Sequence, residues 1–296
     1  RFVDYFQMDK KDIGYLGKGK NKLNSKLDVA TMQSLKNAPE LIEKYSQVIV
    51  DECHHIPAVT FELIVKQFSG KYILGLSATP KRKDGMHPIM FMQCGDIAHE
   101  VKIKKEQIHT LQTVRTKFEA LEDDFALMLN EMVEDFDRNN LIINEIEKLS
   151  NNQVLILSER IEHLNILYHL LDTKKIKSTL LHGGLKSKTK KEALIEAQTS
   201  NIILSTSSYI GEGIDFSHLN AIVFTMPISF DARIIQYLGR IGRRGQKCLA
   251  IDFVDEPTPM LRASFSKRAS AYKKMGYKHV TNKNSSTLNL FSNLSN

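Results

Sequence analysis

The stretch SQVIVDECHH, residues 46–55, decides the fold, because it joins a strand to a pair of acids. Its apolar, β-branched residues 47–50 predict a buried strand, and Asp51 and Glu52 follow that strand directly. In open α/β sheets, ligands bind beyond the carboxyl ends of the strands. Asp51 could therefore hold Mg²⁺ through water, and Glu52 could polarise an attacking water. A lone Asp-Glu pair is more often a solvated acidic turn, so the rest of the chain has to decide between these interpretations.

Cys53, His54 and His55 offer a different interpretation of the same stretch, namely a zinc site. Three consecutive side chains cannot easily converge on one tetrahedral ion, and no second pair with ligand spacing follows them. Zinc is therefore the weaker hypothesis.

Further apolar runs rich in β-branched residues predict strands that are covered on both faces. They are residues 72–76, 154–157, 201–204, 221–224 and 248–253. Stretches with helical spacing lie between them. In RIEHLNILYHLLD, residues 160–172, one face of a helix carries Ile161, Leu164, Leu167, Leu170 and Leu171. Strands that alternate with helices predict an α/β fold with parallel sheets.

The pattern divides the chain into two α/β blocks, residues 1–112 and 140–256, joined by a charged helical linker at 113–139. The first block is expected to be incomplete at its N-terminus, because few sheet elements precede Asp51. A helical segment, residues 257–278, follows the second block. The Asn- and Ser-rich tail, residues 279–296, is expected to be disordered.

Composition limits the function classes. The 296 residues carry a net charge of +7, which suits a polyanionic partner. The three cysteines are dispersed and odd in number, so a disulfide framework is not expected and a reducing compartment is, either the cytoplasm or the nucleoid. No apolar run approaches the ~20 residues that a membrane helix needs. The chain opens on Arg1 without an initiator Met, so we expect a piece of something longer.

Hydroxyl side chains follow two of the predicted strands. The run YILGLSATPKRKDG, residues 72–85, breaks from a strand into Ser77 and Thr79, which could hydrogen-bond the acidic loop or a phosphate. By itself it would be an ordinary turn before a proline. The run NIILSTSSYIGEGIDF, residues 201–216, leads from a strand into a hydroxyl cluster that includes Thr206. Its glycines would let the backbone approach a ligand.

Two arginines recur at a spacing of three in QYLGRIGRRG, residues 236–245. At this spacing, Arg240 and Arg243 share one face of a helix or turn, as a phosphate clamp requires. A basic helix end is the alternative, but such an end would not need the interleaved Gly239 and Gly242.

Taken in order, these stretches resemble the motifs of the superfamily 2 helicases and translocases, DEAD/DEAH-like proteins with two RecA-like domains. DECHH resembles motif II of the D-E-x-H type, and SAT resembles motif III. VLILSERIEHLNIL resembles motif IV, STSSYIGEGIDF motif V, and QYLGRIGRRG motif VI. ATMQSL, residues 30–35, resembles the backbone-gripping motif before motif II, and LLHGGLKSK, residues 180–188, occupies the place of a nucleic-acid-contacting loop. The run SATPKRKDGMHPIMFMQCG is similar to the branch related to the repair helicase of TFIIH, which includes motors attached to restriction or other genome-conflict modules.

The resemblance implies ATP and Mg²⁺ as cofactors, with one set of residues on the nucleotide. Asp51 would bind the Mg²⁺ of MgATP, and Glu52 would be the catalytic base for water. Arg240 and Arg243 would be arginine fingers on the γ-phosphate, and Gln236 would help to place it. Gly213 and Asp215 would line the nucleotide side of motif V.

A second set is implied for nucleic acid and for coupling. Thr31, Gln33, His182, Gly183 and Thr206 would contact the nucleic-acid backbone. His54, Ser77 and Thr79 would couple hydrolysis to that contact. Contacts to the phosphodiester backbone imply that binding has little sequence preference and that its affinity depends strongly on salt concentration.

The phosphate-binding loop of such a motor must precede motif II, and upstream of Asp51 the G-x-x-x-x-G-K pattern occurs at residues 14–20. Polar and charged residues precede this pattern, no apolar helix face follows it, and Asn21 replaces the Ser or Thr that would bind Mg²⁺. We therefore interpret it as a Gly/Lys-rich connection leading to Thr31. The working loop is expected to lie before Arg1, and residues 1–296 alone are expected to hydrolyse ATP negligibly.

Three function classes follow from these observations. The first is a fragment of an ATP-dependent helicase or translocase that acts on DNA rather than RNA, with an attached or associated nuclease or primase module. The second is a nucleic-acid-binding remnant without catalysis. The third is an unrelated α/β hydrolase or metal phosphatase that uses Asp51, Glu52 and the histidines. Oligomeric state, polarity and pathway are not encoded in any motif of the chain.

Overall fold

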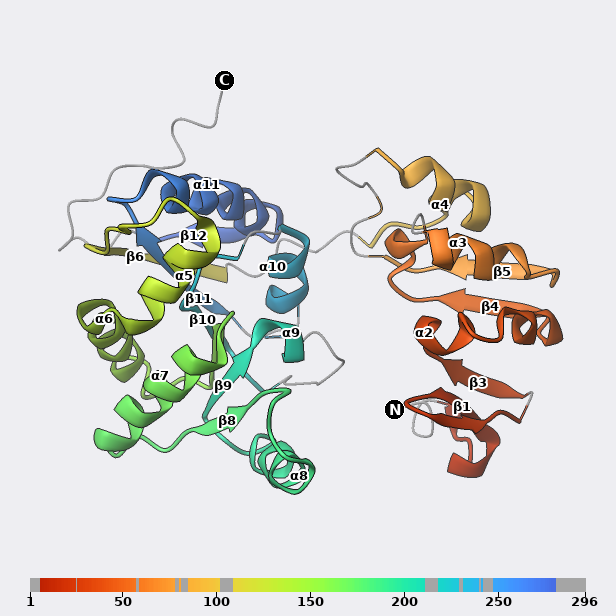
Figure 1. Cartoon of the computed structure of the whole chain (residues 1–296), viewed down its shortest axis with the longest axis horizontal. Helices are drawn as coiled ribbons and strands as arrows, with labels where there is room; N and C mark the ends of the chain where they lie inside the picture. The colour runs from red at the N-terminus through yellow and green to blue at the C-terminus, as the bar shows by residue number, and fades with distance from the viewer. Residues whose placement is uncertain are drawn as a thin grey trace. The chain divides into compact units, whose positions relative to one another are not determined.

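The computed structural model describes residues 6–24, 26–56, 59–77, 80, 85–101, 109–210, 218–228, 231–239, 241 and 247–280. The chain folds into two compact units, Arg1–Lys102 and Ile103–Asn296, which we call the first and the second unit (Figure 1). The fold is α/β, as the alternation of strands and helices predicts.

The first unit contains a three-stranded and a two-stranded sheet. Its strands are β1 (Ile13–Gly17), β2 (Lys20–Lys22), β3 (Leu27–Ala30), β4 (Gln47–Val50) and β5 (Tyr72–Gly75). Its helices are η1 (Lys10–Asp12), α2 (Met32–Leu35), η2 (Pro39–Lys44), η3 (Cys53–His55), α3 (Val59–Lys66) and α4 (His87–Cys94). The order of the first sheet is β2-β1-β3, and β4 pairs with β5 in parallel. A small core formed by Val50, Cys53, Ile56, Val65 and Met90 lies under the β4–β5 pair.

The opening G-x-x-x-x-G-K pattern forms a β-hairpin. Strands β1 and β2 are antiparallel and pair Gly17 with Lys20, which leaves Lys18 and Gly19 as a two-residue turn. Both turn residues have positive φ, 49° and 73°, as the type I′ hairpin turn requires. A phosphate loop would instead leave a strand and open a helix. We expected this stretch to be only a connection leading to Thr31. In the structure it instead forms two paired strands, β1 and β2.

The second unit is built on a seven-stranded parallel sheet with the order β12-β6-β11-β10-β7-β9-β8 (Figure 1). Its strands are β6 (His109–Thr116), β7 (Val154–Ser158), β8 (Thr179–Leu181), β9 (Ile202–Thr206), β10 (Ala221–Phe224), β11 (Leu249–Asp255) and β12 (Tyr277–His279). Its helices are α5 (Phe125–Glu134), α6 (Phe136–Glu147), α7 (Ile161–Thr173), α8 (Ser187–Glu196), α9 (Ser207–Ile210), α10 (Asp231–Leu238) and α11 (Pro259–Lys274).

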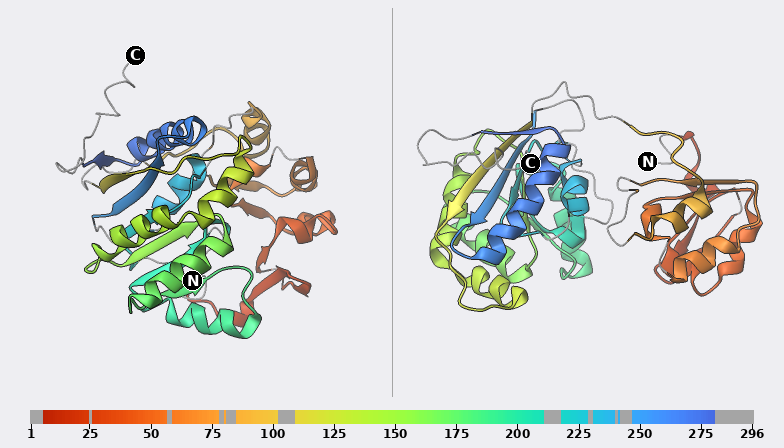
Figure 2. Two further views of the ribbon diagram at one scale, coloured as in Figure 1. Left: turned by 60° about the vertical axis from the view of Figure 1, so that its left-hand side comes forward. Right: turned by 90° about the horizontal axis from the view of Figure 1, so that it is seen from above.

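Helices cover both faces of this sheet (Figure 2). Alternate residues of β7 point to opposite sides, so that Val154 and Ile156 pack with α6 and α7, whereas Leu155 and Leu157 pack with α8 to α11. All four side chains are at most 1% exposed. Burial of each such side chain stabilises the fold by roughly 1.5–3 kcal/mol, which explains why these strands are continuously apolar.

The boundary between the blocks differs from the expected one. Residues 109–116 form β6, which pairs with β11 along its length and therefore belongs to the second sheet. Residues 113–139 are not a separate linker, because α5 and the start of α6 pack on the second unit. Asp124 and Asp135 cap these two helices, accepting hydrogen bonds from the backbone N–H of Leu127 at 3.1 Å and of Arg138 at 2.6 Å. The segment 257–278 contains α11 and most of β12, and the tail beyond residue 280 lies outside the described residues.

Within the described ranges, the helices are too short or too polar to cross a membrane.

Candidate functional site

The acidic pair of the first unit lies where two parallel strands end side by side. Val50 of β4 is paired with Gly75 of β5, so Asp51 and Leu76 leave the sheet at the same edge. Two hydrogen bonds extend the ladder beyond the strands. The Leu76 N–H donates to the Val50 carbonyl at 2.8 Å, and the Cys53 N–H donates to the Leu76 carbonyl at 2.9 Å. The loop that carries the acids is thus held by the strand that leads to Ser77.

Glu52 adopts a backbone conformation that is unusual for its residue type. Its φ of 51° and ψ of 45° place it in the left-handed region, where a residue with a Cβ loses roughly 1–2 kcal/mol. Its N–H donates to Asp51 Oδ1 at 3.0 Å, which fixes the Asp51 carboxylate against the Glu52 backbone. Strain of this kind gathers at functional sites, where surrounding contacts hold it in place.

His54 connects the acidic loop to the end of β5. Its Nδ1 lies 3.0 Å from Ser77 Oγ and 3.3 Å from Glu52 Oε2. A carboxylate only accepts hydrogen bonds, so the contact with Glu52 requires a hydrogen on Nδ1. The structure therefore brings Asp51, Glu52, His54 and Ser77 together within the first unit, while Thr79 lies outside the described residues.

Cys53 lies buried beneath this loop. It is 5% exposed and lies 3.5 Å from the Met90 sulfur. Burial, with the nearby Cys94, raises the pKa of Cys53 to about 11, so the thiol stays protonated at neutral pH. Among the described residues, no group of three His, Cys, Asp or Glu side chains could hold a metal ion.

Mg²⁺ makes a different demand, which Asp51 meets. Mg²⁺ in nucleotide sites keeps several waters and is bound by one or two carboxylates together with substrate phosphates. Asp51 is exposed, and the contact with Glu52 occupies its Oδ1, so its Oδ2 can face a hydrated ion. The donor set fits Mg²⁺ held with phosphates.

Thr31 and Gln33 lie at the junction of β3 and α2. Both side chains are exposed, and Thr31 Oγ1 donates to Ser34 Oγ at 2.9 Å. The Thr31 N–H donates to the Leu16 carbonyl at 3.0 Å, which ties this corner to β1. The two residues are therefore available to a ligand.

In the second unit, the loop after β8 and the end of β9 lie side by side. Leu181 is paired with Ser205, so His182 and Thr206 leave the sheet at the same edge. His182 is 7% exposed, and its Nδ1 accepts a hydrogen bond from the Gly184 N–H at 3.2 Å. Burial lowers the pKa of His182, Glu162 opposes this effect and Lys190 adds to it, so the imidazole is neutral.

Thr206 itself is buried, with 6% of its surface exposed. Its hydroxyl accepts a hydrogen bond from Ser208 Oγ at 3.4 Å, and Ser208 is exposed. The outward hydroxyl at this corner is thus that of Ser208, which the motif comparison did not single out. The alternation of buried and exposed residues after β9 could have indicated it.

Ser207 connects three segments that the sequence motifs treat separately. Its hydroxyl donates to Glu159, which follows β7, and its carbonyl accepts from Tyr237 Oη of α10 at 2.9 Å. Sequence reasoning missed Glu159 and Tyr237, because neither is defined by a local pattern. Gln236 also belongs to α10, although its side chain is outside the described set.

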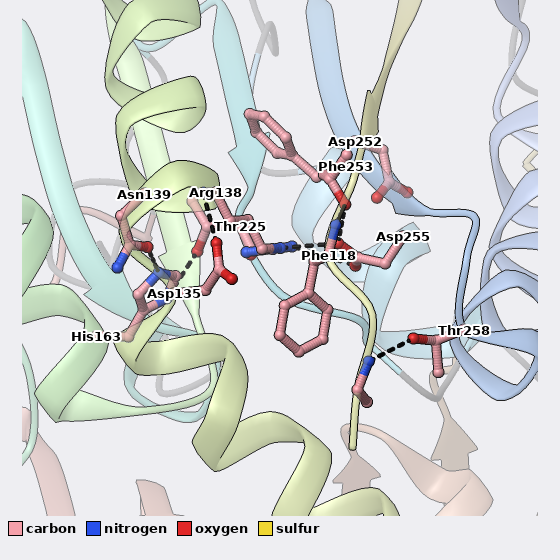
Figure 3. A network of polar contacts seen from close by, with 12 residues as sticks. Phe118, Asp135, Arg138, Asn139, His163, Thr225, Asp252, Phe253, Asp255 and Thr258 are labelled. Carbon is pink, nitrogen blue, oxygen red and sulfur yellow. Dashed lines mark hydrogen bonds and ion pairs between the residues drawn. The ribbon is translucent and has the colours of Figure 1, made fainter. Parts of the chain in front are cut away.

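A buried polar network supports the same edge of the sheet (Figure 3). Arg138 of α6 donates to both carboxylate oxygens of Asp255 at 2.8 and 3.3 Å and to the Thr225 carbonyl at 2.7 Å. His163 of α7 contacts Ser158 Oγ through Nδ1 at 3.1 Å and Asn139 Oδ1 through Nε2 at 2.8 Å. These residues come from the ends of β7, β10 and β11 and from the helices beside them, so they hold the strand ends in place.

Four further residues of the expected nucleotide site are not placed. Gly213, Asp215, Arg240 and Arg243 all lie outside the described residues.

Comparison with protein families assigns both units. Residues 1–82 match the model of the "Type III restriction enzyme, res subunit", and residues 137–245 match the "Helicase conserved C-terminal domain". Together the two matches cover more than half of the chain. The chain belongs to the superfamily 2 helicases.

Two relatives illustrate the range of this superfamily. A protein of Acanthamoeba polyphaga mimivirus, named as an ATP-dependent RNA helicase, is 26% identical over 270 residues, which span 84% of this chain and 51% of the relative. The DNA 3'-5' translocase XPB2 of Sulfurisphaera tokodaii is 23% identical, over 87% of this chain and 69% of the relative. The chain therefore spans between half and about two thirds of the length of these helicases.

Among solved structures, the fold is similar to S. cerevisiae Dbp5 bound to RNA and ADP BeF3, with a TM-score of 0.65 at 17% identity. The match covers 94% of this chain and 72% of Dbp5. At this identity the likeness supports the fold, two RecA-like domains, and says nothing of the substrate.

Proposed function

We propose that this chain is the core of an ATP-dependent motor that translocates along nucleic acid or unwinds it. The observation that carries the proposal is the arrangement of Asp51, Glu52, His54 and Ser77 at one sheet edge, where His54 Nδ1 lies within 3.3 Å of both Glu52 and Ser77. A solvated acidic turn would not need a strained Glu52 held by a histidine and a neighbouring strand.

Each residue of this edge has a chemical role in the proposal. The bound nucleotide supplies the phosphoryl group that is transferred to water. Glu52 accepts the proton of the attacking water, and Asp51 holds the hydrated Mg²⁺. His54 orients Glu52. Through its contact with Ser77, it also transmits conformational changes of the acidic loop to the segment after β5. Gln236, Gly213, Asp215, Arg240 and Arg243 remain the proposed nucleotide contacts of the second unit.

Nucleic acid is the proposed partner of the exposed Thr31 and Gln33. It is also the proposed partner of the edge formed by His182, Gly183 and, in place of the buried Thr206, the exposed Ser208. The net charge of +7 favours a polyanion. We propose DNA rather than RNA, supported by the resemblance of residues 77–95 to the repair-helicase branch and by the DNA translocase among the relatives. The mimivirus relative, which is named for RNA, makes RNA the alternative to be tested.

The hairpin at residues 13–22 bears on hydrolysis by residues 1–296 alone. A helicase-type motor needs a lysine in a phosphate loop to hold the nucleotide, and this hairpin opens no helix. We therefore propose that these residues alone hydrolyse ATP negligibly. The same observation favours a second candidate function, nucleic-acid binding without hydrolysis.

The test is Glu52→Gln in the full-length gene product, with Glu62→Gln as the matched control. Gln keeps the size of the side chain but cannot accept the proton, so nucleic-acid-stimulated ATP turnover should fall by at least about 100-fold. Binding of a single-stranded oligonucleotide should stay unchanged. Glu62 lies on α3 of the same unit in a partly exposed pair with Lys66, so its replacement should leave turnover intact.

Turnover that survives Glu52→Gln would overturn the proposed role of the acidic loop. Wild-type protein that binds nucleic acid but never hydrolyses ATP would establish the second candidate instead.

A further inference from the structure

The net charge of the chain is concentrated in one segment. Residues 1–256 contain 34 Lys and Arg and 34 Asp and Glu, so their formal charges cancel. Residues 257–296 contain seven Lys and Arg and no Asp or Glu, so the whole net charge of +7 belongs to them. An asymmetry of this kind is typical of a basic segment that binds a polyanion.

In the structure this segment begins with helix α11, which lies at the surface over one face of the second sheet (Figure 2). Arg268 of α11 is 1% exposed and donates to both carboxylate oxygens of Asp252, at 2.8 and 2.9 Å. Tyr272 Oη donates to the same carboxylate at 2.8 Å. The buried face of α11 is therefore anchored, and its buried cation is neutralised.

The other cations of this segment that the structure describes are exposed and lack a carboxylate partner. The carboxylate of Glu256, just before the helix, pairs with Arg115 Nε at 3.2 Å. Arg262 donates to the carbonyl oxygen of Glu256, at 3.4 Å, which leaves its charge uncompensated. Four further exposed cations form no ion pair with the residues that the structure describes: Lys267, Lys273, Lys274 and Lys278.

The exposed cations of α11 form two rows. Lys267 and Lys274 are seven residues apart and lie along one side of the exposed face. Arg262 and Lys273 are eleven residues apart and lie along the other side. Three small, exposed residues lie between the rows: Ala263, Ser266 and Ser270. A polyanion therefore has room to lie close to the helix between two rows of positive charge.

A merely solvated helix face is the alternative, and α11 does not have its composition. Solvated helices gain stability from Asp or Glu placed four residues from Lys or Arg. Among the described helices that contain Lys or Arg, α11 alone contains no acid. The helix dipole favours Lys273 and Lys274 at the C-terminal end, but it opposes Arg262 near the N-terminal end and does not account for Lys267 in the middle.

The residues between the rows decide the class of polyanion. A membrane surface would need large apolar side chains on this face, and small residues occupy the strip instead. Ammonium, guanidinium and hydroxyl groups are the side-chain groups that contact phosphates of nucleic acids. The face therefore fits a phosphodiester backbone.

We propose that the exposed face of α11 is a second nucleic-acid surface, separate from the residues of the helicase motifs. A phosphodiester strand lies along Ala263, Ser266 and Ser270, and the cations of the two rows pair with its phosphates. These contacts involve the backbone alone, so the surface reads no sequence. The inference rests on the proposed function and adds to it an attachment outside the sheet edges.

The first test compares Lys267→Gln/Lys274→Gln with Lys44→Gln/Lys177→Gln in the full-length gene product. Both pairs remove two exposed, unpaired lysines, so the change in net charge is the same. The affinity for a labelled single-stranded oligonucleotide is measured at several KCl concentrations. For the α11 pair, binding should weaken by about tenfold, and the slope of log K against log salt should become shallower by about 0.7 for each lysine.

The control pair should lose about twofold or less and keep the slope of the wild type. Equal losses and equal slopes for the two pairs would overturn the surface.

The second test places a charge between the two rows by comparing Ser270→Glu with Ser270→Gln. The two new side chains have the same size and are both good helix formers, so neither variant should unfold at a lower temperature than the wild type. Ser270→Glu should bind the oligonucleotide at least about fivefold more weakly than Ser270→Gln, because its carboxylate faces the phosphates. Equal binding by the two variants would overturn the proposed path of the strand.

The wild type distinguishes this inference from the function it rests on. Salt-dependent binding by the wild type, together with unchanged binding by Lys267→Gln/Lys274→Gln, would reject the surface and leave the proposed function standing. A wild type without salt-dependent binding would reject both. If the α11 pair instead lost binding to phosphatidylserine vesicles or to polyglutamate and kept its oligonucleotide affinity, the face would belong to a membrane or an acidic protein, and the proposal would be wrong.

Discussion

His163 is a side chain whose ionisation is strongly changed by folding. It is 0% exposed, and both ring nitrogens are engaged, by Ser158 and by Asn139. Burial first, and the nearby Arg138 second, lower the pKa of His163 from 6.5 to about 3. The folded protein therefore holds a neutral imidazole over a range of pH in which the unfolded chain would bind a proton.

This difference predicts acid sensitivity of the second unit. Between pH 6.5 and about pH 3 the unfolded state binds more protons than the native state, so stability rises with pH in this window and is lost as the pH falls. From pH 7 to pH 5, His163 should lower the free energy of unfolding by about 2 kcal/mol. Urea unfolding at the two pH values measures this loss, and His163→Gln should reduce the difference by the same amount. A His163→Gln protein with the pH dependence of the wild type would contradict the assignment.

At the scale of elements, Gly75 decides how closely β5 approaches the loop with the acids. A Cβ on Gly75 would lie 2.9 Å from Cys53 Sγ and 3.1 Å from both Cβ and Sγ of Cys94. These distances are too short for van der Waals contact, so any larger residue has to move η3 or α4.

Gly75→Ala should therefore destabilise the first unit by about 1–3 kcal/mol, because overpacking forces neighbouring side chains from their positions. Cys53→Ala removes the nearest sulfur and should recover part of the loss in the double variant. Chemical denaturation of the three variants measures this coupling. A Gly75→Ala protein as stable as the wild type would show that the loop has more room than the structure gives it.

The pair formed by Arg138 and Asp255 joins α6 to the end of β11. Both side chains are 1% exposed, so removal of one partner leaves a buried charge without its counterpart. Asp255→Leu should cost about 3–5 kcal/mol of unfolding free energy, and the double variant Arg138→Met/Asp255→Leu should cost clearly less than the sum of the single changes. Urea unfolding provides the cycle, with the partly exposed Glu62–Lys66 pair as a control worth about 0–1 kcal/mol. Additive losses at Arg138 and Asp255 would contradict the coupling.

The elements also show what the sequence can predict. Residues 47–50 and 221–224 form β4 and β10 at the predicted positions, and all four residues of β10 are buried, as cover on both faces requires. The same expectation is wrong for β4 and β5, where Ile49, Tyr72 and Leu74 are exposed. β6 escaped prediction because HTLQTVRT contains only two apolar residues, Leu111 and Val114, three positions apart. Its assignment to the second sheet depends on pairing with β11, which lies far along the chain. The hairpin at residues 13–22 depends on a positive φ at Lys18, and lysine is not a residue type that indicates positive φ in a sequence.

The candidate site divides in the same way. The approach of Glu52, His54 and Ser77 follows from two strands that end at one sheet edge, which a strand pattern reveals. Thr206 is buried, and Lys190 Nζ lies over the ring of Tyr209. Both features follow from packing between α8, α9 and β9, which no local motif encodes.

At the scale of the whole molecule, the proposed motor requires more than two binding units. Each unit presents candidate ligand residues at the carboxyl edge of a sheet, and the net charge of +7 favours a nucleic-acid partner. A motor additionally requires that nucleotide and nucleic acid change each other's affinity, and by linkage the change is reciprocal.

The most direct measurement is the affinity of the full-length gene product for single-stranded DNA, and for RNA of the same sequence, without nucleotide and with ADP and beryllium fluoride. A nucleotide-driven motor predicts at least about a fivefold difference between the two states, as coupled sites usually show. It also predicts that Glu52→Gln keeps this difference, because the replaced group acts in hydrolysis. Equal affinity with and without the nucleotide analogue would contradict a nucleotide-driven motor, whichever nucleic acid is bound.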